Sequence, residues 1–101
     1  MKKYTIHVSP RARLDILDLE NLITYLYSAP LTAKRYVESL YARIYSLSSF
    51  AESIRVSDKQ DILRFGTNAR AISFKKMLIV YTVRDTLVII EAVIPASLVI
   101  K

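Results

Sequence analysis

The sequence is poor in the residues that cross-link or interrupt a chain. Its 101 residues include no cysteine, no tryptophan, three prolines and one glycine, Gly66. Without cysteine, disulfides and thiolate metal sites are excluded, which fits a reducing compartment. No apolar run approaches the roughly 20 residues that span a bilayer, and no signal-peptide core follows the basic start. We therefore expect a cytoplasmic protein with no membrane partner.

The charge balance is basic. Fifteen Lys and Arg oppose nine Asp and Glu, which gives a net charge of +6. Such a surface suits an anionic partner, either nucleic acid or an acidic protein, although positive charge can also serve only solubility. A length of 101 residues with 52% hydrophobic residues predicts a single domain, residues 1–101, with its own core.

The first half of the chain has the periodicity of one strand and two helices. Residues 4–8 alternate apolar and polar, as a half-buried strand does, and Ser9-Pro10 has the residue types of a helix start. Two apolar stripes follow, broken at Pro30: Ala12, Ile16, Leu19, Ile23 and Leu26, then Ala33, Tyr36 or Val37, Leu40, Ile44 and Leu47. We predict an antiparallel helical hairpin whose second helix covers about residues 31–48.

The second half has a loop-like segment and then three strands. Residues 50–68 are mixed and charged, with a short strand or helical turn expected around 62–65. The β-rich runs at 69–74, 77–83 and 87–94 are separated by Lys75-Lys76 and by Arg84-Asp85-Thr86, a pattern typical of two hairpins. The predicted fold class is α+β, a helical hairpin packed on a small twisted antiparallel sheet, in the order β-α-α-β-β-β.

These pieces together resemble the RelE/ParE superfamily of bacterial toxins. The resemblance rests on Ser9-Pro10, Ala12, Asp15-Ile16, Leu19 and Ile23, on the second stripe, on Arg70 and Ile72, and on Ile79-Val80-Tyr81 followed by residues 88–93. It covers nearly the whole chain. It implies a type II toxin–antitoxin (plasmid stabilisation) system in which a cognate antitoxin binds the toxin. Some relatives cut mRNA on the ribosome and others poison DNA gyrase.

The positions that carry the nuclease site in related toxins hold unsuitable residues here. The resemblance places an arginine where Leu78 stands, a histidine at Pro95, and basic residues at Ser97 and Ala92. None of these four can transfer a proton or bind phosphate through charge. Whether the chain is an enzyme is therefore left open by the sequence, and no catalytic residue is assigned.

Four basic residues near the predicted sheet remain candidates for binding a target or a phosphate: Arg64, Arg70, Lys75 and Lys76. The lysine pair is expected at a hairpin tip, where it could equally be a solvated turn. Arg70 shares the parity of Ile72 and Phe74, so a buried ion pair is its alternative. His7, the only histidine, falls on the polar face of the first strand. Asp15, Asp18 and Glu20 suit the positive end of the helix dipole, and neither a metal site nor a cofactor is predicted.

Three hypotheses follow for function. The chain is a toxin that binds an essential target such as DNA gyrase; or it is a ribosome-dependent mRNA endoribonuclease with a non-standard basic site; or it is an inactive relative that only binds its antitoxin. In each case we expect the antitoxin to cover apolar or basic surface near the helices and the three strands, because an acidic segment suits a +6 partner.

Overall fold

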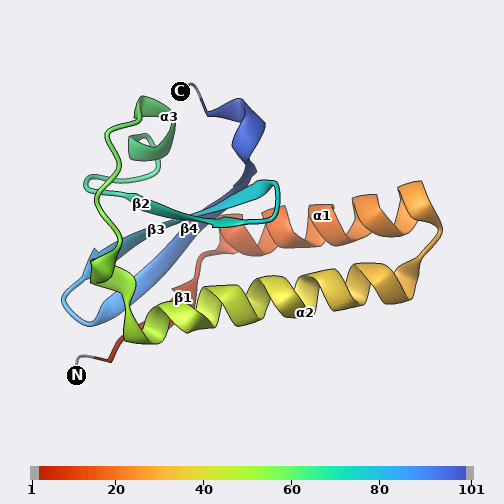
Figure 1. Cartoon of the computed structure of the whole chain (residues 1–101), viewed down its shortest axis with the longest axis horizontal. Helices are drawn as coiled ribbons and strands as arrows, with labels where there is room; N and C mark the ends of the chain where they lie inside the picture. The colour runs from red at the N-terminus through yellow and green to blue at the C-terminus, as the bar shows by residue number, and fades with distance from the viewer. Residues whose placement is uncertain (1–2, 100–101) are drawn as a thin grey trace.

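The computed structural model describes residues 3–99 and contains seven principal elements in this part of the chain. They are β1 (Thr5–Val8), α1 (Pro10–Tyr27), α2 (Pro30–Ser46), α3 (Gln60–Leu63), β2 (Arg70–Phe74), β3 (Met77–Arg84) and β4 (Leu87–Pro95). Short 3-10 turns occupy Leu47–Ser49, Ala51–Ser53 and Ala96–Leu98. The predicted α+β class and the order β-α-α-β-β-β are confirmed, with α3 as the helical turn expected in the loop-like segment (Figure 1).

The sheet has four strands in the order β1-β4-β3-β2, and it is not antiparallel throughout. Strands β2, β3 and β4 form the predicted antiparallel meander, but β1 runs parallel to β4, with Val8 opposite Ile90. The prediction of a wholly antiparallel sheet is therefore wrong for this pair. Hairpin turns fix the direction of neighbouring strands, whereas β1 is joined to the meander by a long helical connection that leaves its direction open.

The helix ends follow local chemistry. At the start of α1, the Ser9 side chain accepts a hydrogen bond of 3.1 Å from the Ala12 N–H, and Pro10 occupies the first turn. The helix ends at Tyr27, its C-cap Ser28 has a left-handed φ of 48°, and Pro30 begins α2 after this short turn. The second helix ends at Ser46, slightly before the predicted position, because the chain tightens into the 3-10 turn Leu47–Ser49.

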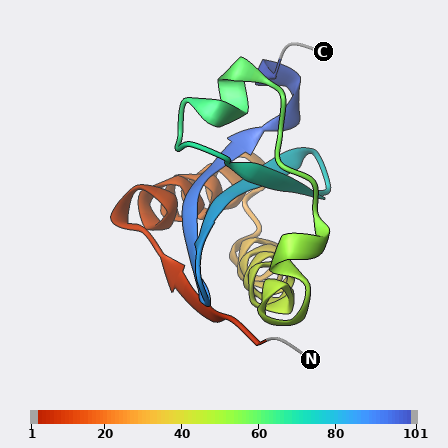
Figure 2. The same cartoon turned by 90° about the vertical axis from the view of Figure 1, so that its left-hand side faces the viewer.

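The two faces of the sheet are covered by different parts of the chain. The larger core cluster joins α1 and α2 to Ile72, Ile79, Tyr81, Val88 and Ile90, whereas a smaller one joins α3 to the opposite face through Ile62, Ala69, Val80, Ala92 and Ile94. Figure 2 shows α3 and the last turn on the side of the sheet away from the hairpin. The apolar character of β3 and β4 thus reflects burial on both faces.

A bulge in β4 reverses which face its residues occupy. Val80 pairs with Ala92 and Tyr81 pairs with Ile90, so Glu91 has no partner in β3. Beyond this point Val93 faces the helical hairpin and Ala92 the opposite side. The bulge therefore brings Val93 under α1, where the groove described below is formed.

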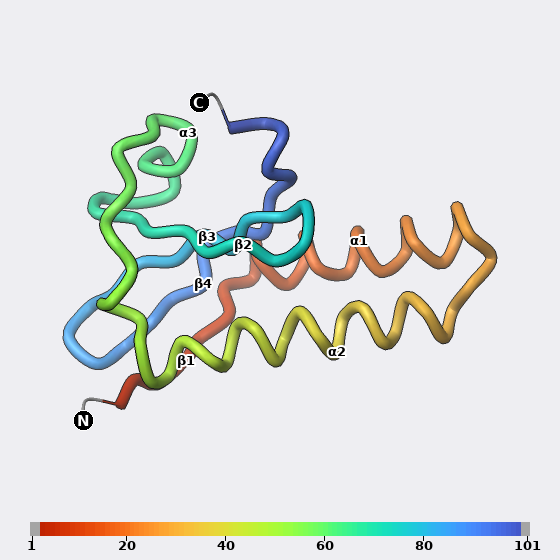
Figure 3. The backbone as a smooth tube through the Cα atoms, in the orientation of Figure 1, coloured from red at the N-terminus to blue at the C-terminus, as the bar shows by residue number. Residues whose placement is uncertain are grey.

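The helical hairpin extends well past the end of the sheet (Figures 1 and 3). Ala12 and Ile16, near the start of α1, are buried, but Leu26, at the end of the predicted stripe, is 58% exposed because no strand lies beneath it. Other large apolar side chains of this overhang are also exposed: Leu22, Tyr25, Tyr27 and Leu31. No helix within residues 3–99 is long and apolar enough to cross a membrane.

Candidate functional site: an apolar groove and dispersed basic residues

Arg70 is a structural residue in this fold. Its Nη1 donates to the carbonyl oxygen of Ala51 at 3.3 Å, and the buried hydroxyl of Tyr81 donates to the same oxygen at 2.7 Å. The inward direction predicted from its parity is confirmed, but its partner is a carbonyl rather than the carboxylate of an ion pair. Its buried Nε has no hydrogen-bond partner in the described part of the chain. Arg70 therefore fastens the turn after α2 to the sheet.

Lys75 and Lys76 form the turn between β2 and β3, as predicted from the sequence. Lys75 has a left-handed φ of 54°, and its Nζ lies 4.9 Å from the ring centroid of Tyr36 and 5.5 Å from that of Phe74. These two rings meet edge to face at 5.2 Å. Both lysines are exposed, and the Lys75 ammonium group lies beside an aromatic pair that joins α2 to the sheet.

Arg64 lies just after α3, on the other side of the sheet. Its guanidinium is 4.8 Å from the ring centroid of Phe65, and that of Arg11 is 5.3 Å from the same centroid. The four predicted basic residues therefore occupy three separate places: beside Phe65, beneath the turn after α2, and at the β2–β3 turn. The structure does not assemble them into one cluster.

The positions that resemble nuclease sites lie in apolar or uncharged surroundings. Leu78 and Ala92 belong to the smaller core cluster, packed with α3, whereas Pro95 and Ser97 are exposed. His7 lies on β1, an outer strand of the sheet, and is exposed as predicted. Its imidazole is therefore on a different strand from the two C-terminal positions.

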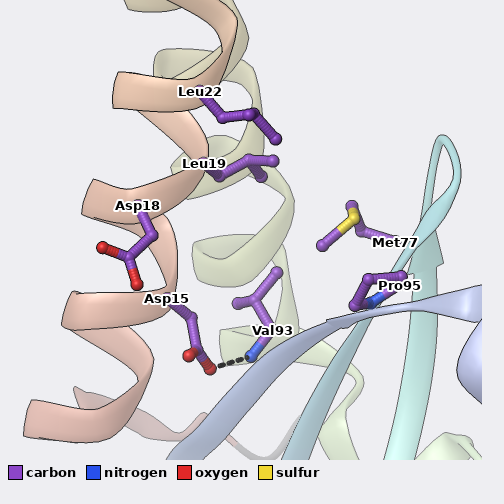
Figure 4. Close-up of a pocket in the computed structure, with 7 residues that line it drawn as sticks. All are labelled: Asp15, Asp18, Leu19, Leu22, Met77, Val93 and Pro95. Carbon is purple, nitrogen blue, oxygen red and sulfur yellow. Dashed lines mark hydrogen bonds between the residues drawn. The ribbon is translucent and has the colours of Figure 1, made fainter.

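An open apolar groove separates α1 from the end of the sheet (Figure 4). Its volume is about 190 Å³, and it is lined by Leu19, Leu22, Met77, Val93 and Pro95, together with Asp15 and Asp18. In Figure 4, Leu19 and Leu22 point from α1 toward Met77 and Pro95 across the gap. The groove exists because the overhanging hairpin and the meander diverge at this point, while Val93 lies between them.

The two carboxylates at this groove have different partners. Asp15 accepts a hydrogen bond of 3.0 Å from the Val93 N–H and lies 3.6 Å from the Arg11 Nε. It therefore satisfies an amide of β4 beyond Ile90, the last residue of β4 that pairs with β1. Asp18 is exposed and forms no ion pair with any residue from 3 to 99.

Sequence reasoning placed both acids at the favourable end of the helix dipole and missed the groove. Their three-residue spacing, which puts them on one side of α1, was its only signal.

A second, polar cavity lies on the α3 side of the sheet. It has a volume of about 410 Å³ and is lined by Phe65, Gly66, Thr67, Thr82, Val83, Arg84 and Glu91. The Thr82 hydroxyl donates to the Glu91 carboxylate at 2.7 Å. No group of three or more His, Asp or Glu side chains in residues 3–99 is placed to hold a metal ion. The cavity therefore offers hydrogen-bonding groups but no such metal centre.

Comparisons with known proteins agree with this architecture. Residues 6–97 match the family model described as the ParE toxin of the type II toxin–antitoxin system, parDE. Among solved structures, a chain from the "Chromosomal ParDE TA system from P. aeruginosa" is similar, with a TM-score of 0.76. The similarity covers 92% of this chain and 96% of that one, at 13% sequence identity, so it bears on the fold alone. Among curated proteins, none matches the sequence.

Proposed function

This chain belongs to the ParE toxin family and is a toxin of a type II toxin–antitoxin system, and from that premise we propose that it stops growth by binding DNA gyrase. The observation that carries the proposal is the chemistry of the sheet. Leu78 and Ala92 pack into an apolar cluster, and Pro95 and Ser97 add no charge to it. A nuclease needs groups that move a proton and stabilise an anionic transition state. An inhibitor that only binds its target needs neither.

The dispersed basic residues also support binding over catalysis. Arg70 is engaged with the Ala51 carbonyl, and Lys75 lies against Tyr36 and Phe74. Arg64 is on the opposite face of the sheet, beside Phe65. General acid–base chemistry requires groups within hydrogen-bond reach of one reacting bond, which this distribution does not provide. Because gyrase acts on DNA in the cytoplasm, the proposal places the protein there.

We further propose that the antitoxin covers the groove and the exposed apolar surface of the overhanging hairpin. Leu22, Tyr25, Leu26 and Leu31 are between 51% and 84% exposed, an unusual grouping for a helix pair that stands alone in water. A partner that buried them would stabilise the folded toxin by mass action. The product of the neighbouring antitoxin gene should therefore raise the melting temperature of this chain, and an unchanged melting temperature would contradict the proposal.

The target is tested by inducing this chain alone in bacteria and following plasmid supercoiling and bulk mRNA in the same culture. We expect lost supercoiling or DNA breaks with intact mRNA. Purified chain should likewise inhibit supercoiling by purified gyrase, and inhibition should disappear when antitoxin is added. Rapid ribosome-dependent mRNA cleavage would instead identify the nuclease, and variants of Arg64, Arg70, Lys75 and Lys76 would then locate its site. Normal growth with both measurements unchanged would leave an inactive relative that only binds its antitoxin.

A further inference from the structure

We propose that the groove beside α1 binds one lysine or arginine side chain of the antitoxin, with its methylene stem against Leu19 and Leu22 and its charged head at Asp18. This inference rests on the proposed function only in taking the antitoxin as the partner. It specifies a chemical feature of that partner which its overall charge does not predict, because a basic toxin would be expected to select acidic residues.

The groove has two parts with opposite chemistry. Leu19 and Leu22 form one wall, Met77 and Pro95 form the other, and Val93 lies between them. Asp15 and Asp18 also line the groove: the Asp15 carboxylate turns toward Val93 at one end of the channel, whereas the Asp18 carboxylate lies at the outer rim, on the side of α1 away from Met77 and Pro95 (Figure 4). Lysine and arginine have the same two-part character, because an aliphatic stem carries a charged head. A purely apolar side chain would fill the channel and leave Asp18 without a counter-charge, since Arg11 pairs only with Asp15.

Of the two carboxylates, Asp18 is the one that can form an ion pair with this ammonium or guanidinium group. Asp15 already accepts the Val93 N–H and has Arg11 within 3.6 Å, whereas Asp18 pairs with no cation among residues 3–99. The two acids are three residues apart on one side of α1, where like charges destabilise a helix slightly. A cation between them would remove this repulsion. The chain carries fifteen Lys and Arg, yet the fold brings none of the described ones to Asp18.

The geometry around the groove points to a cation supplied from outside. Arg11 is the one basic residue of α1 that pairs at the groove, and it pairs with Asp15. Lys76, in the β2–β3 turn, forms no ion pair with any residue from 3 to 99. Leu22 lines the groove, and the exposed Leu26 follows it by four residues on α1. A partner segment that covers the overhang would therefore pass the groove and could place a long cationic side chain in it.

The test compares the antitoxin affinity of Asp18→Asn with that of a matched control, Glu38→Gln. Glu38 is also an exposed helix carboxylate, on α2, but it does not line the groove. The titrant is the purified product of the neighbouring antitoxin gene. We expect Asp18→Asn to raise the dissociation constant about tenfold at low salt, because a charge-assisted contact at a partner surface is lost. The loss should shrink as salt rises, and Glu38→Gln should bind as the parent chain does.

A charge exchange identifies the partner residue. Asp18→Lys should abolish tight binding, and changing one specific lysine or arginine of the antitoxin to glutamate should restore it. Wild-type affinity in Asp18→Asn, or restoration by no single antitoxin position, would overturn the inference. A change in self-association of the free toxin instead of antitoxin affinity would overturn it too, because the occupant would then be a second copy of this chain.

The outcome is separable from that of the gyrase proposal. Gyrase inhibition is measured on the free variants, and antitoxin affinity is measured without gyrase. If the parent chain fails to inhibit gyrase but Asp18→Asn still weakens antitoxin binding, the target proposal fails and the groove inference stands. If gyrase is inhibited and Asp18→Asn binds antitoxin normally, the target proposal stands and the groove inference fails. Thermal unfolding of each variant checks that the exposed substitution leaves the fold intact.

Discussion

Arg70 and Tyr81 are direct partners across β2 and β3, and their side chains donate hydrogen bonds to the same oxygen, the carbonyl of Ala51. The contact joins the 3-10 turn Ala51–Ser53 to the middle of the sheet. In the sequence, Ala51 is 19 residues from Arg70 and 30 residues from Tyr81. An arginine that the family pattern marks as a candidate for binding a target thus has a defined structural task. Variants at this position must be assayed for stability before activity is interpreted.

The first prediction is that these two hydrogen bonds contribute unequally to the free energy of unfolding. The Tyr81 bond is shorter and its side chain is fully buried, whereas Arg70 has a buried Nε without a partner in the described chain. We expect Tyr81→Phe to lower the free energy of unfolding by about 1–2 kcal/mol, and Arg70→Met to cost less. Urea denaturation measures both. Tyr45→Phe, at a tyrosine that is 51% exposed, is the control and should have no effect. A larger loss for Arg70→Met would contradict this ranking.

The second prediction is a loss of stability at alkaline pH that depends on Tyr81. Burial raises the pKa of Tyr81 to about 12, against an opposing effect of the nearby Arg70 charge. In the unfolded chain this hydroxyl ionises near pH 10. Its contribution to folding is therefore complete below pH 10 and is lost as pH rises toward 12. The stability gap between the parent chain and Tyr81→Phe should narrow across this window, and a constant gap would show that Tyr81 does not titrate abnormally.

The third prediction concerns the only glycine. A Cβ atom at Gly66 would lie 2.8 Å from Cγ2 of Thr82, closer than carbon atoms can pack. Gly66→Ala should therefore destabilise the chain by about 1–3 kcal/mol, as overpacked sites do. Thr82→Ser removes Cγ2 but keeps the hydroxyl that bonds to Glu91, so the double variant Gly66→Ala/Thr82→Ser should recover much of the loss. Equal stabilities for the single and double variants would exclude the steric explanation.

The fourth prediction separates the two acids of the groove. Asp15→Ala leaves the Val93 N–H, at the β4 bulge, without its acceptor and should cost about 1–3 kcal/mol of unfolding free energy. Asp18→Ala removes an exposed carboxylate and should change stability by no more than about 0.5 kcal/mol. Thermal melts of the two variants in parallel measure the difference. If both variants were equally destabilised, Asp18 would have a structural role that its exposure does not suggest.

Much of the local structure could be predicted because it follows from short-range chemistry. Ser9 and Pro10 set the start of α1, Pro30 separates the helices, and the polar pairs between apolar runs mark the turns of the meander. Cap preference, the fixed φ of proline and the two periodicities of helix and strand act within a few residues. They therefore give the order of elements and the fold class directly, and the order of the pieces also carried the family resemblance.

The site could be predicted only in part, because it depends on how elements meet. The sequence pattern pointed to Arg64, Arg70, Lys75 and Lys76, which the fold distributes over three places. It gave no warning that Asp15 would accept an amide of β4, because that contact spans 78 residues. Similarly, the stripe on α1 predicted burial through Leu26, but burial requires a strand beneath the helix, and the sheet ends first.

The sequence by itself therefore determined the elements and their order. The tertiary structure decided the parallel pairing of β1 with β4, the bulge at Glu91, and the groove that residues of α1 and of the end of the sheet line together. The physical reason is the distance along the sequence over which each interaction acts. Periodicity and capping are properties of a few consecutive residues, whereas strand direction, register shifts and the overlap of two elements arise only when distant segments compete for the same surface.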